Sequence, residues 1–189
     1  MSKPYIPILL GSSRPDCYSS KVARYVNNTL KENKRAEVDL HTPGEFIQEM
    51  TIPPWQEEYA DETRDWRDIA ETADAFIIVA PEYNHGYPGE LKIVLDEDLE
   101  NYKGKPVLTC GVSAGHFGGA RMVEHILMVY NELGLVNVPY PVYFSNVHEL
   151  FDEKDKNQRD EEYKERLENS FDKLLTYQSH LEDLHEDII

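Results

Sequence analysis

The sequence contains few residues that bind metals or form disulfide bonds. Its two cysteines, Cys17 and Cys110, are too few for a disulfide framework, an iron–sulfur cluster or a four-thiolate zinc site. The seven histidines are scattered, and His180 and His185 are five residues apart, so they do not share one face of a helix. We therefore expect no metal centre.

Basic residues and long apolar runs are also scarce. The chain has 19 Lys and Arg against 36 Asp and Glu, a formal net charge of -17. A strongly acidic surface repels phosphate backbones and anionic lipid headgroups, so we expect neither a nucleic-acid nor a membrane partner. The longest apolar run, residues 75–80, is far shorter than the ~18 residues that span a bilayer. Because the N-terminus has too short an apolar stretch for a signal peptide, we expect a reduced, cytoplasmic protein.

Short apolar runs alternate with helical patterns along the 189 residues. The runs typical of buried strands lie at 8–10, 36–40, 75–80, 107–112, 135–138 and 142–144. Apolar residues at helical spacing lie at 22–30, 62–72, 91–95, 122–130 and 167–184. Such alternation predicts a parallel sheet with helices on both faces. We therefore expect one α/β domain over residues 1–189, a flavodoxin-like three-layer doubly wound sandwich with five strands in the order 2-1-3-4-5.

Two segments fit this pattern less simply. Pro7 has no amide to donate within a central strand, so the pairing of the first strand is expected to begin after Pro7 or to leave it at an edge position. Residues 151–162, FDEKDKNQRDEE, read as a solvated acidic linker. The final helix is expected over about residues 160–185.

The loop at residues 11–20 lies between the first strand and the first helix. A helix N-terminus offers unpaired amides and the positive end of a dipole to a phosphate. Ser12, Ser19 and Ser20 add hydroxyl donors, and Arg14 adds a charge-assisted donor. The loop matches neither the P-loop pattern nor G-x-G-x-x-G, which argues against a nucleotide triphosphatase and a Rossmann site. It is either a phosphate-binding loop or a serine-rich turn that caps the helix.

Two further loops follow predicted strands. Residues 81–92, PEYNHGYPGELK, form a stiff loop with aromatic side chains suited to a ligand pocket. Residues 111–121, GVSAGHFGGAR, are rich in small residues that let a flat ligand approach the backbone. The alternatives are an ordinary turn before a helix for the first and a flexible glycine-rich connection for the second.

Taken together, the three loops resemble the NAD(P)H-dependent FMN reductase family of flavodoxin-like proteins. The family pattern G-S-x-R matches Gly11, Ser12 and Arg14. The pattern P-E-Y-N-x-x-x-P-G-x-L-K matches residues 81–92, and S-x-G-x-x-G-G matches residues 113–119. The resemblance spans residues 5–145, although 41–60 matches poorly and Ile93 and Val94 replace the usual Asn and Ala.

The resemblance implies an FMN site and a redox reaction. The implied cofactor-binding residues are Ser12, Arg14, Ser19, Ser20, Pro81, Glu82, Tyr83, Asn84, His85, Gly86, Ser113, Ala114, Gly115, Gly118 and Gly119. The implied reaction is hydride transfer from NADPH or NADH to FMN, and from there to a flavin, quinone or azo acceptor, by a ping-pong mechanism. No catalytic side chain is required. Members of the family commonly form homodimers or homotetramers.

Two other functions fit parts of the same pattern. A non-enzymatic FMN-binding electron carrier would share the fold and the cofactor but would not be reduced quickly by NAD(P)H. GVSAG at residues 111–115 also matches the nucleophile elbow of serine hydrolases, with Ser113 as nucleophile and His148 downstream. That motif needs a helix to begin directly after the serine, whereas residues 116–119 read HFGG, which favours a ligand loop.

Overall fold

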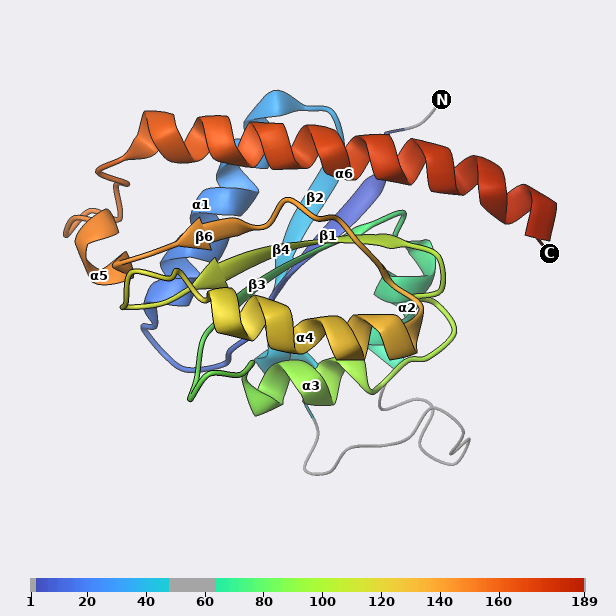
Figure 1. Ribbon diagram of the computed structural model, residues 1–189, viewed down its shortest axis with the longest axis horizontal. Helices are drawn as coiled ribbons and strands as arrows, with labels where there is room; N and C mark the ends of the chain where they lie inside the picture. The colour runs from blue at the N-terminus through green and yellow to red at the C-terminus, as the bar shows by residue number, and fades with distance from the viewer. Residues whose placement is uncertain (1–2, 48–63, 189) are drawn as a thin grey trace.

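The computed structural model describes residues 3–47 and 64–188. Its strands are β1 (Tyr5–Leu10), β2 (Glu37–His41), β3 (Phe76–Pro81), β4 (Pro106–Val112), β5 (Val136–Asn137) and β6 (Val142–Phe144). Its helices are α1 (Tyr18–Asn33), the 3-10 turn η1 (Pro43–Glu45), α2 (Arg64–Thr72), α3 (Gly89–Leu95), α4 (Ala120–Leu133), α5 (Val147–Leu150) and α6 (Asp160–Ile188). Strands and helices alternate from β1 to α4 as expected, and β5, β6, α5 and α6 follow (Figure 1).

The strands form one parallel sheet, in which the order β2-β1-β3-β4-β5 confirms the predicted flavodoxin-like topology. The expected fifth strand is divided in two, because β5 pairs with the start of β4 and β6 pairs with its end. Residues 138–141, VPYP, separate the two pieces. Prolines have no amide hydrogen to donate to a ladder, which accounts for the interruption.

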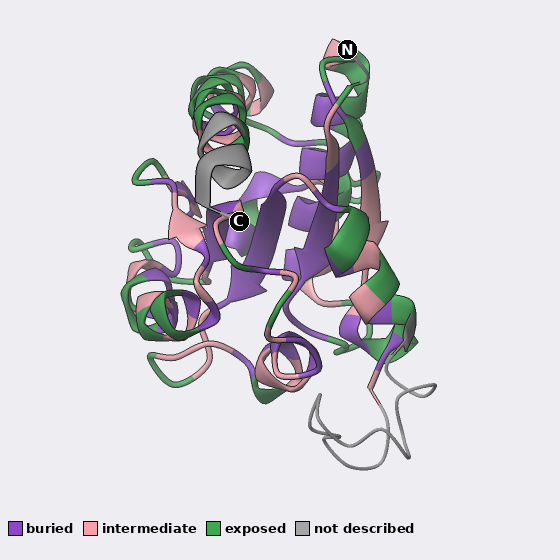
Figure 2. Cartoon of the chain, turned by 90° about the vertical axis from the view of Figure 1, so that its right-hand side faces the viewer, coloured by how far each residue is buried: buried purple, intermediate pink, exposed green. Residues whose placement is uncertain are grey.

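Two apolar layers cover the sheet, one on each face. The first layer packs α1, α5 and α6 on alternate strand residues such as Ile77 and Val79. The second packs α2, α3 and α4 on the intervening residues such as Phe76 and Ile78. Figure 2 shows the buried strands enclosed between the two sets of helices. Cys110 is fully buried in β4, and burial raises the pKa of its thiol to about 12, so it acts as a small apolar packing residue.

Pro7 lies inside β1 rather than before it. Pairing of β1 with β2 starts at Tyr5 and includes Pro7 opposite Asp39, whereas pairing with β3 starts at Ile8. The Tyr5 amide, two residues earlier, points to the β3 side and donates to Asp74 Oδ2 at 2.7 Å. The Pro7 nitrogen therefore faces β3, and the β1–β3 ladder begins only after it, at Ile8, so Pro7 is not required to donate within that ladder.

The last part of the chain differs from the predicted linker. Residues 152–158 fold into a hydrogen-bonded turn, and Phe151 and Asn157 form an isolated antiparallel bridge across it. Helix α6 then runs from Asp160 across the sheet face that α1 also covers (Figure 1). No helix within the described ranges is long and apolar enough to span a membrane. The poorly matching segment 41–60 lies outside the described residues from position 48 onward.

Candidate functional site

Three loops meet beyond the carboxyl ends of β1, β3 and β4, as expected for adjacent parallel strands. They enclose a cavity of about 440 Å³, which is within the usual range for cofactor sites. Of the residues predicted to bind the cofactor, Arg14, Ser19, Pro81, Glu82, Tyr83, Ser113 and Ala114 line it. The structure thus gathers parts of all three predicted loops around one cavity.

The N-terminus of α1 opens onto this cavity without a side-chain cap. Cys17 is the N-cap residue, and its side chain makes no capping hydrogen bond. Its thiol instead lies 3.0 Å from the hydroxyl of Ser19, which is buried. Arg14 is exposed at the cavity rim. The free amides of the first turn, the Ser19 hydroxyl and the Arg14 guanidinium together suit an anionic group.

Two of the predicted phosphate ligands are used in other contacts. Ser12 is 1% exposed, and its hydroxyl lies 3.0 Å from that of Tyr83 and 3.3 Å from Glu90 Oε1. The Ser20 hydroxyl donates to the Cys17 carbonyl at 2.7 Å. A hydroxyl carries one proton, so the Ser20 proton is already engaged. Neither side chain lines the cavity, and both shape the loop around it.

The loop after β3 is a tight turn with a fixed shape. Tyr83 and Gly86 exchange two backbone hydrogen bonds of 2.9 Å. Between them, Asn84 and His85 have positive φ angles of 49° and 67°. These two side chains are exposed and do not line the cavity. Gly86 packs against His125, where an added Cβ would lie 3.1 Å from Nδ1.

Glu82 places a carboxylate at the cavity, and Arg121 of α4 compensates its charge. Arg121 Nε donates to Glu82 Oε1 at 2.8 Å, and Nη2 lies 2.7 Å from the same oxygen. The Glu82 side chain is only 6% exposed, and its Oε2 has no hydrogen-bond partner among the described residues. A buried acceptor without a partner is costly unless a ligand or water donates to it.

In the third loop, Ser113 and Ala114 line the cavity, whereas three predicted glycines have other roles. Gly115 is exposed, and its carbonyl accepts hydrogen bonds from Asn146 and from the Ser113 hydroxyl. Gly118 and Gly119 are buried, and an added Cβ on either would lie 2.7 Å from atoms of Tyr143 or Val112. They allow the loop to pack on β4 and β6.

The geometry around Ser113 is not that of a hydrolase. Its hydroxyl donates to the Gly115 carbonyl at 3.0 Å, and α4 begins only at Ala120. In the part of the chain that the structure describes, no imidazole accepts a hydrogen bond from Ser113. Among the described residues, Ser113 therefore has neither the elbow nor the general base that a serine nucleophile needs.

Some cavity residues were missed by sequence reasoning. The additional lining residues are Pro15, Asp16, Cys17, Tyr18, Val112 and Val147. Val147 is the first residue of α5, which follows β6 after a short loop, and its amide donates to the Ser113 carbonyl at 3.1 Å. Because the carboxyl ends of parallel strands meet at one edge, the loop after the fifth strand could have been included. Within residues 3–47 and 64–188, no group of three or more metal-ligating side chains is gathered.

Known proteins share both the sequence and the fold. Residues 4–149 match the model of the family described as NADPH-dependent FMN reductase. The NAD(P)H-dependent FMN reductase LOT6 of Saccharomyces cerevisiae is 30% identical over 158 residues, which cover 72% of this chain and 81% of that protein. A quinone reductase of Pseudomonas putida is 28% identical over 168 residues, 82% of this chain and 86% of that protein.

A solved structure shows the same architecture. FerB of Paracoccus denitrificans, a flavoenzyme NAD(P)H:(acceptor) oxidoreductase, superposes with a TM-score of 0.74 over 94% of this chain and 98% of its own. At 20% sequence identity this likeness establishes the fold. With the family match over residues 4–149, it confirms the resemblance that the three loops indicated. The chain belongs to the NADPH-dependent FMN reductase family, and it is an oxidoreductase that uses FMN as cofactor and NAD(P)H as electron donor.

Proposed function

We propose that the cavity at the carboxyl edge of the sheet holds FMN, and that the protein passes electrons from NAD(P)H to a quinone, azo compound or free flavin by a ping-pong mechanism. The observation that carries the proposal is the uncapped N-terminus of α1, which shares one cavity with Arg14 and with the loop after β3. Relatives named as quinone reductase and as FMN-dependent NADPH-azoreductase support these acceptor classes.

The residues around the cavity suit both the phosphate and the isoalloxazine ring of FMN. The first-turn amides of α1, the Ser19 hydroxyl and Arg14 supply donors for a phosphate. Glu82, which also lines the cavity, has a carboxylate oxygen without a partner among the described residues, which suits a ligand N–H such as the one on the isoalloxazine ring. The Arg121 guanidinium offsets the charge of that carboxylate, so the anionic cofactor is not repelled by an unpaired Glu82.

FMN supplies the redox chemistry when bound, because it accepts a hydride from NAD(P)H and gives two electrons to the acceptor. The protein binds and orients. Arg14 and the start of α1 hold the phosphate, while the rigid Tyr83–Gly86 turn fixes one wall of the cavity. No side chain has to move a proton in a hydride transfer, so we assign no catalytic residue.

Exposed apolar side chains support assembly into a homodimer or homotetramer. Phe117, in the loop before α4, and Met128, on α4, are 66% and 67% exposed. Met128 lines a shallow depression together with His125 and Arg121. Large apolar groups gathered on one face are typical of protein–protein contacts.

The proposed function predicts a spectral change on adding the electron donor. The purified protein, reconstituted with FMN and freed of excess, should show flavin absorption that bleaches when NADPH or NADH is added under nitrogen. A quinone should then restore the bands, and double-reciprocal plots of steady-state rates should give parallel lines. Bands that persist with both donors would indicate an electron carrier. No retained flavin at all would reject the proposal.

Arg14 should contribute to cofactor affinity through its charge. Replacing Arg14 with alanine is expected to raise the Kd of FMN about tenfold, because a charge-assisted contact to the phosphate is lost. The measurement is the quenching of flavin fluorescence as apoprotein is added. Arg35→Ala removes the same charge beyond the far end of α1, where Arg35 pairs with Asp172, and should leave the Kd unchanged. Equal affinities for the two variants would remove Arg14 from the site.

A further inference from the structure

The first turn of α1 is central to the proposed phosphate site, but it has no cap of its own. Cys17 makes no side-chain capping bond, and the first turn contains no acidic residue. Ser20 is one of the residues that hold its backbone, because its amide and hydroxyl both donate to the Cys17 carbonyl, at 3.1 and 2.7 Å. The orientation of the first-turn amides therefore depends in part on what fixes Ser20.

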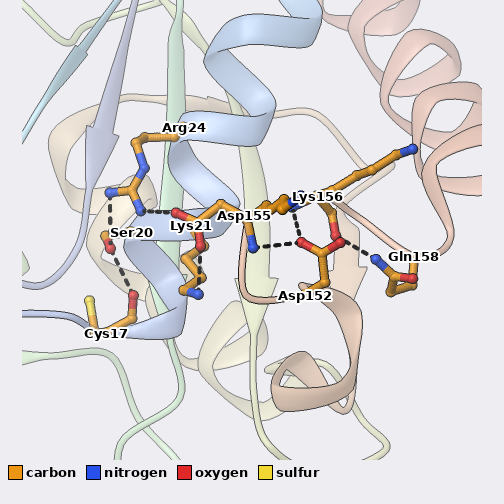
Figure 3. A network of polar contacts seen from close by, with 9 residues as sticks. Cys17, Ser20, Lys21, Arg24, Asp152, Asp155, Lys156 and Gln158 are labelled. Carbon is orange, nitrogen blue, oxygen red and sulfur yellow. Dashed lines mark hydrogen bonds and ion pairs between the residues drawn. The ribbon is translucent and has the colours of Figure 1, made fainter.

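A turn from the other end of the chain lies against this part of α1. Asp152 closes the turn, because its Oδ1 accepts the amides of Lys154 and Lys156, both at 2.9 Å. The Asp152 carbonyl also accepts the Asp155 amide at 3.0 Å. These bonds give the turn a fixed shape, and Figure 3 shows that it presents the Asp155 side chain to α1.

Asp155 links this turn to the start of α1 through two cations. Its Oδ1 lies 2.6 Å from Lys21 Nζ, and its Oδ2 accepts a hydrogen bond of 3.1 Å from Arg24 Nη2. Arg24 Nη1 in turn donates to the Ser20 hydroxyl at 3.3 Å (Figure 3). The Lys21 ammonium and the Arg24 guanidinium hold the pKa of Asp155 below its usual value, so it is ionised at neutral pH. One series of contacts thus runs from Asp155 through Arg24 and Ser20 to the Cys17 carbonyl.

The backbone at this position indicates that the side chain matters. Asp155 has a φ of 59°, in the left-handed region that glycine adopts without strain. Aspartate and asparagine tolerate this region better than other residues, but they still prefer the right-handed one. A carboxylate is therefore present where the turn alone would favour glycine.

We propose that Asp155 is a positioning residue for the cofactor phosphate: it fixes Arg24 against Ser20 and thereby holds the first turn of α1 in the orientation that binds the phosphate. The inference rests on the proposed function of the cavity. It assigns the turn at residues 152–158 a role in cofactor affinity, although none of its residues lines that cavity.

A purely electrostatic role and a positioning role of Asp155 predict opposite effects of its removal on FMN affinity. Removing a negative charge near an anion site favours anion binding, whereas releasing Arg24 and Ser20 weakens it. Glu153 provides the matched control, since it is exposed in the same turn and Glu153→Gln removes the same charge. Asp155→Asn keeps a residue that tolerates the left-handed region, and Asp155→Gly relieves the backbone strain, so the turn should fold in both variants.

The test compares the Kd values of FMN and riboflavin for the full-length apoprotein by fluorescence quenching. Asp155→Asn and Asp155→Gly are expected to raise the Kd of FMN about threefold to fivefold relative to Glu153→Gln, the range for an exposed ion-pair network. The Kd of riboflavin, which has no phosphate, should stay unchanged, and Asp155→Gly should unfold in urea no earlier than the wild type.

Two results would overturn the inference. An FMN affinity of Asp155→Asn equal to or tighter than that of Glu153→Gln would show that only charge matters. Equal weakening for riboflavin and FMN would show a general structural defect. If either occurred while Arg14→Ala still weakened FMN binding, the proposed function would stand and the role of Asp155 would fall. A wild-type protein that binds no FMN would reject the proposed function itself.

Discussion

Replacing Glu97 with glutamine is expected to remove a loss of stability that the wild-type protein undergoes as the pH rises from about 5 to 7. Glu97 follows α3 and is 2% exposed, and its Oε2 has no hydrogen-bond partner among the described residues. Burial raises the pKa of its carboxyl group from 4.5 to about 7, although the nearby Arg67 guanidinium partly opposes this. Arg67 cannot offset burial fully, since its Nε donates to the Glu97 backbone carbonyl at 2.7 Å.

The direction of the effect follows from proton binding. Between pH 4.5 and about 7 the folded protein keeps the Glu97 proton while the unfolded chain releases it. The free energy of unfolding therefore falls as the pH rises through this window. Above the window, Glu97 is ionised in both states, and the free energy stays at the lower value. A shift of this size corresponds to about 3 kcal/mol. Glutamine is neutral at every pH, so the variant should be more stable than the wild type by about this amount at pH 8.

Urea unfolding at pH 5, 6, 7 and 8 measures the difference between the two proteins. The gap between Glu97→Gln and the wild type should widen with pH up to about 7 and then stay constant. Glu165→Gln, at an exposed position of α6, should follow the wild-type trend at every pH. A constant gap for Glu97→Gln from pH 5 to 8 would mean that Glu97 is ionised in the folded protein throughout.

Glu97 also illustrates which features a sequence reveals. It stands in LDEDLE, residues 95–100, which reads as a solvated acidic surface, but the end of α3 turns Glu97 and Asp98 inward. The parallel sheet was predictable because its evidence is periodic: continuous apolar runs such as residues 75–80 are buried on both faces of β3. The burial of one carboxylate depends on contacts between distant segments, here with Arg67, and it leaves no local pattern.

The same distinction holds within the candidate site. The placement of the three loops followed from strand order, and family motifs identified Arg14 and Pro81 to Tyr83 at the cavity. The hydrogen-bond partners of the serine hydroxyls could not be predicted in the same way, because a contact such as that of Ser12 with Tyr83 joins residues 71 positions apart. The proline-interrupted fifth strand shows a third case. The apolar runs at 135–138 and 142–144 were both visible in the sequence, but their separate pairing with the start and the end of β4 was not.

Replacing Gly119 with alanine is expected to destabilise the fold by about 3 kcal/mol, from backbone strain and overpacking together. Gly119 is the N-cap residue of α4 and has a φ of 85°, where a side chain is strained. An added Cβ would lie 2.7 Å from the Val112 nitrogen and 3.1 Å from the Gly111 Cα and carbonyl carbon. These are backbone atoms of β4, so relief requires the loop to move away from the sheet.

Gly89→Ala provides the matched control for this prediction. Gly89 is the first residue of α3, is exposed, and has no neighbouring atom within 4 Å of an added Cβ. Alanine favours helix there, so this variant should be as stable as the wild type or slightly more stable in urea. Because moving the loop also displaces Ser113 and Ala114 from the cavity wall, Gly119→Ala should lose FMN affinity while Gly89→Ala keeps it. Equal urea midpoints for the two variants would show that the loop after β4 can move away from the sheet at little cost in stability. The close packing of Gly119 would then not be what shapes the cavity.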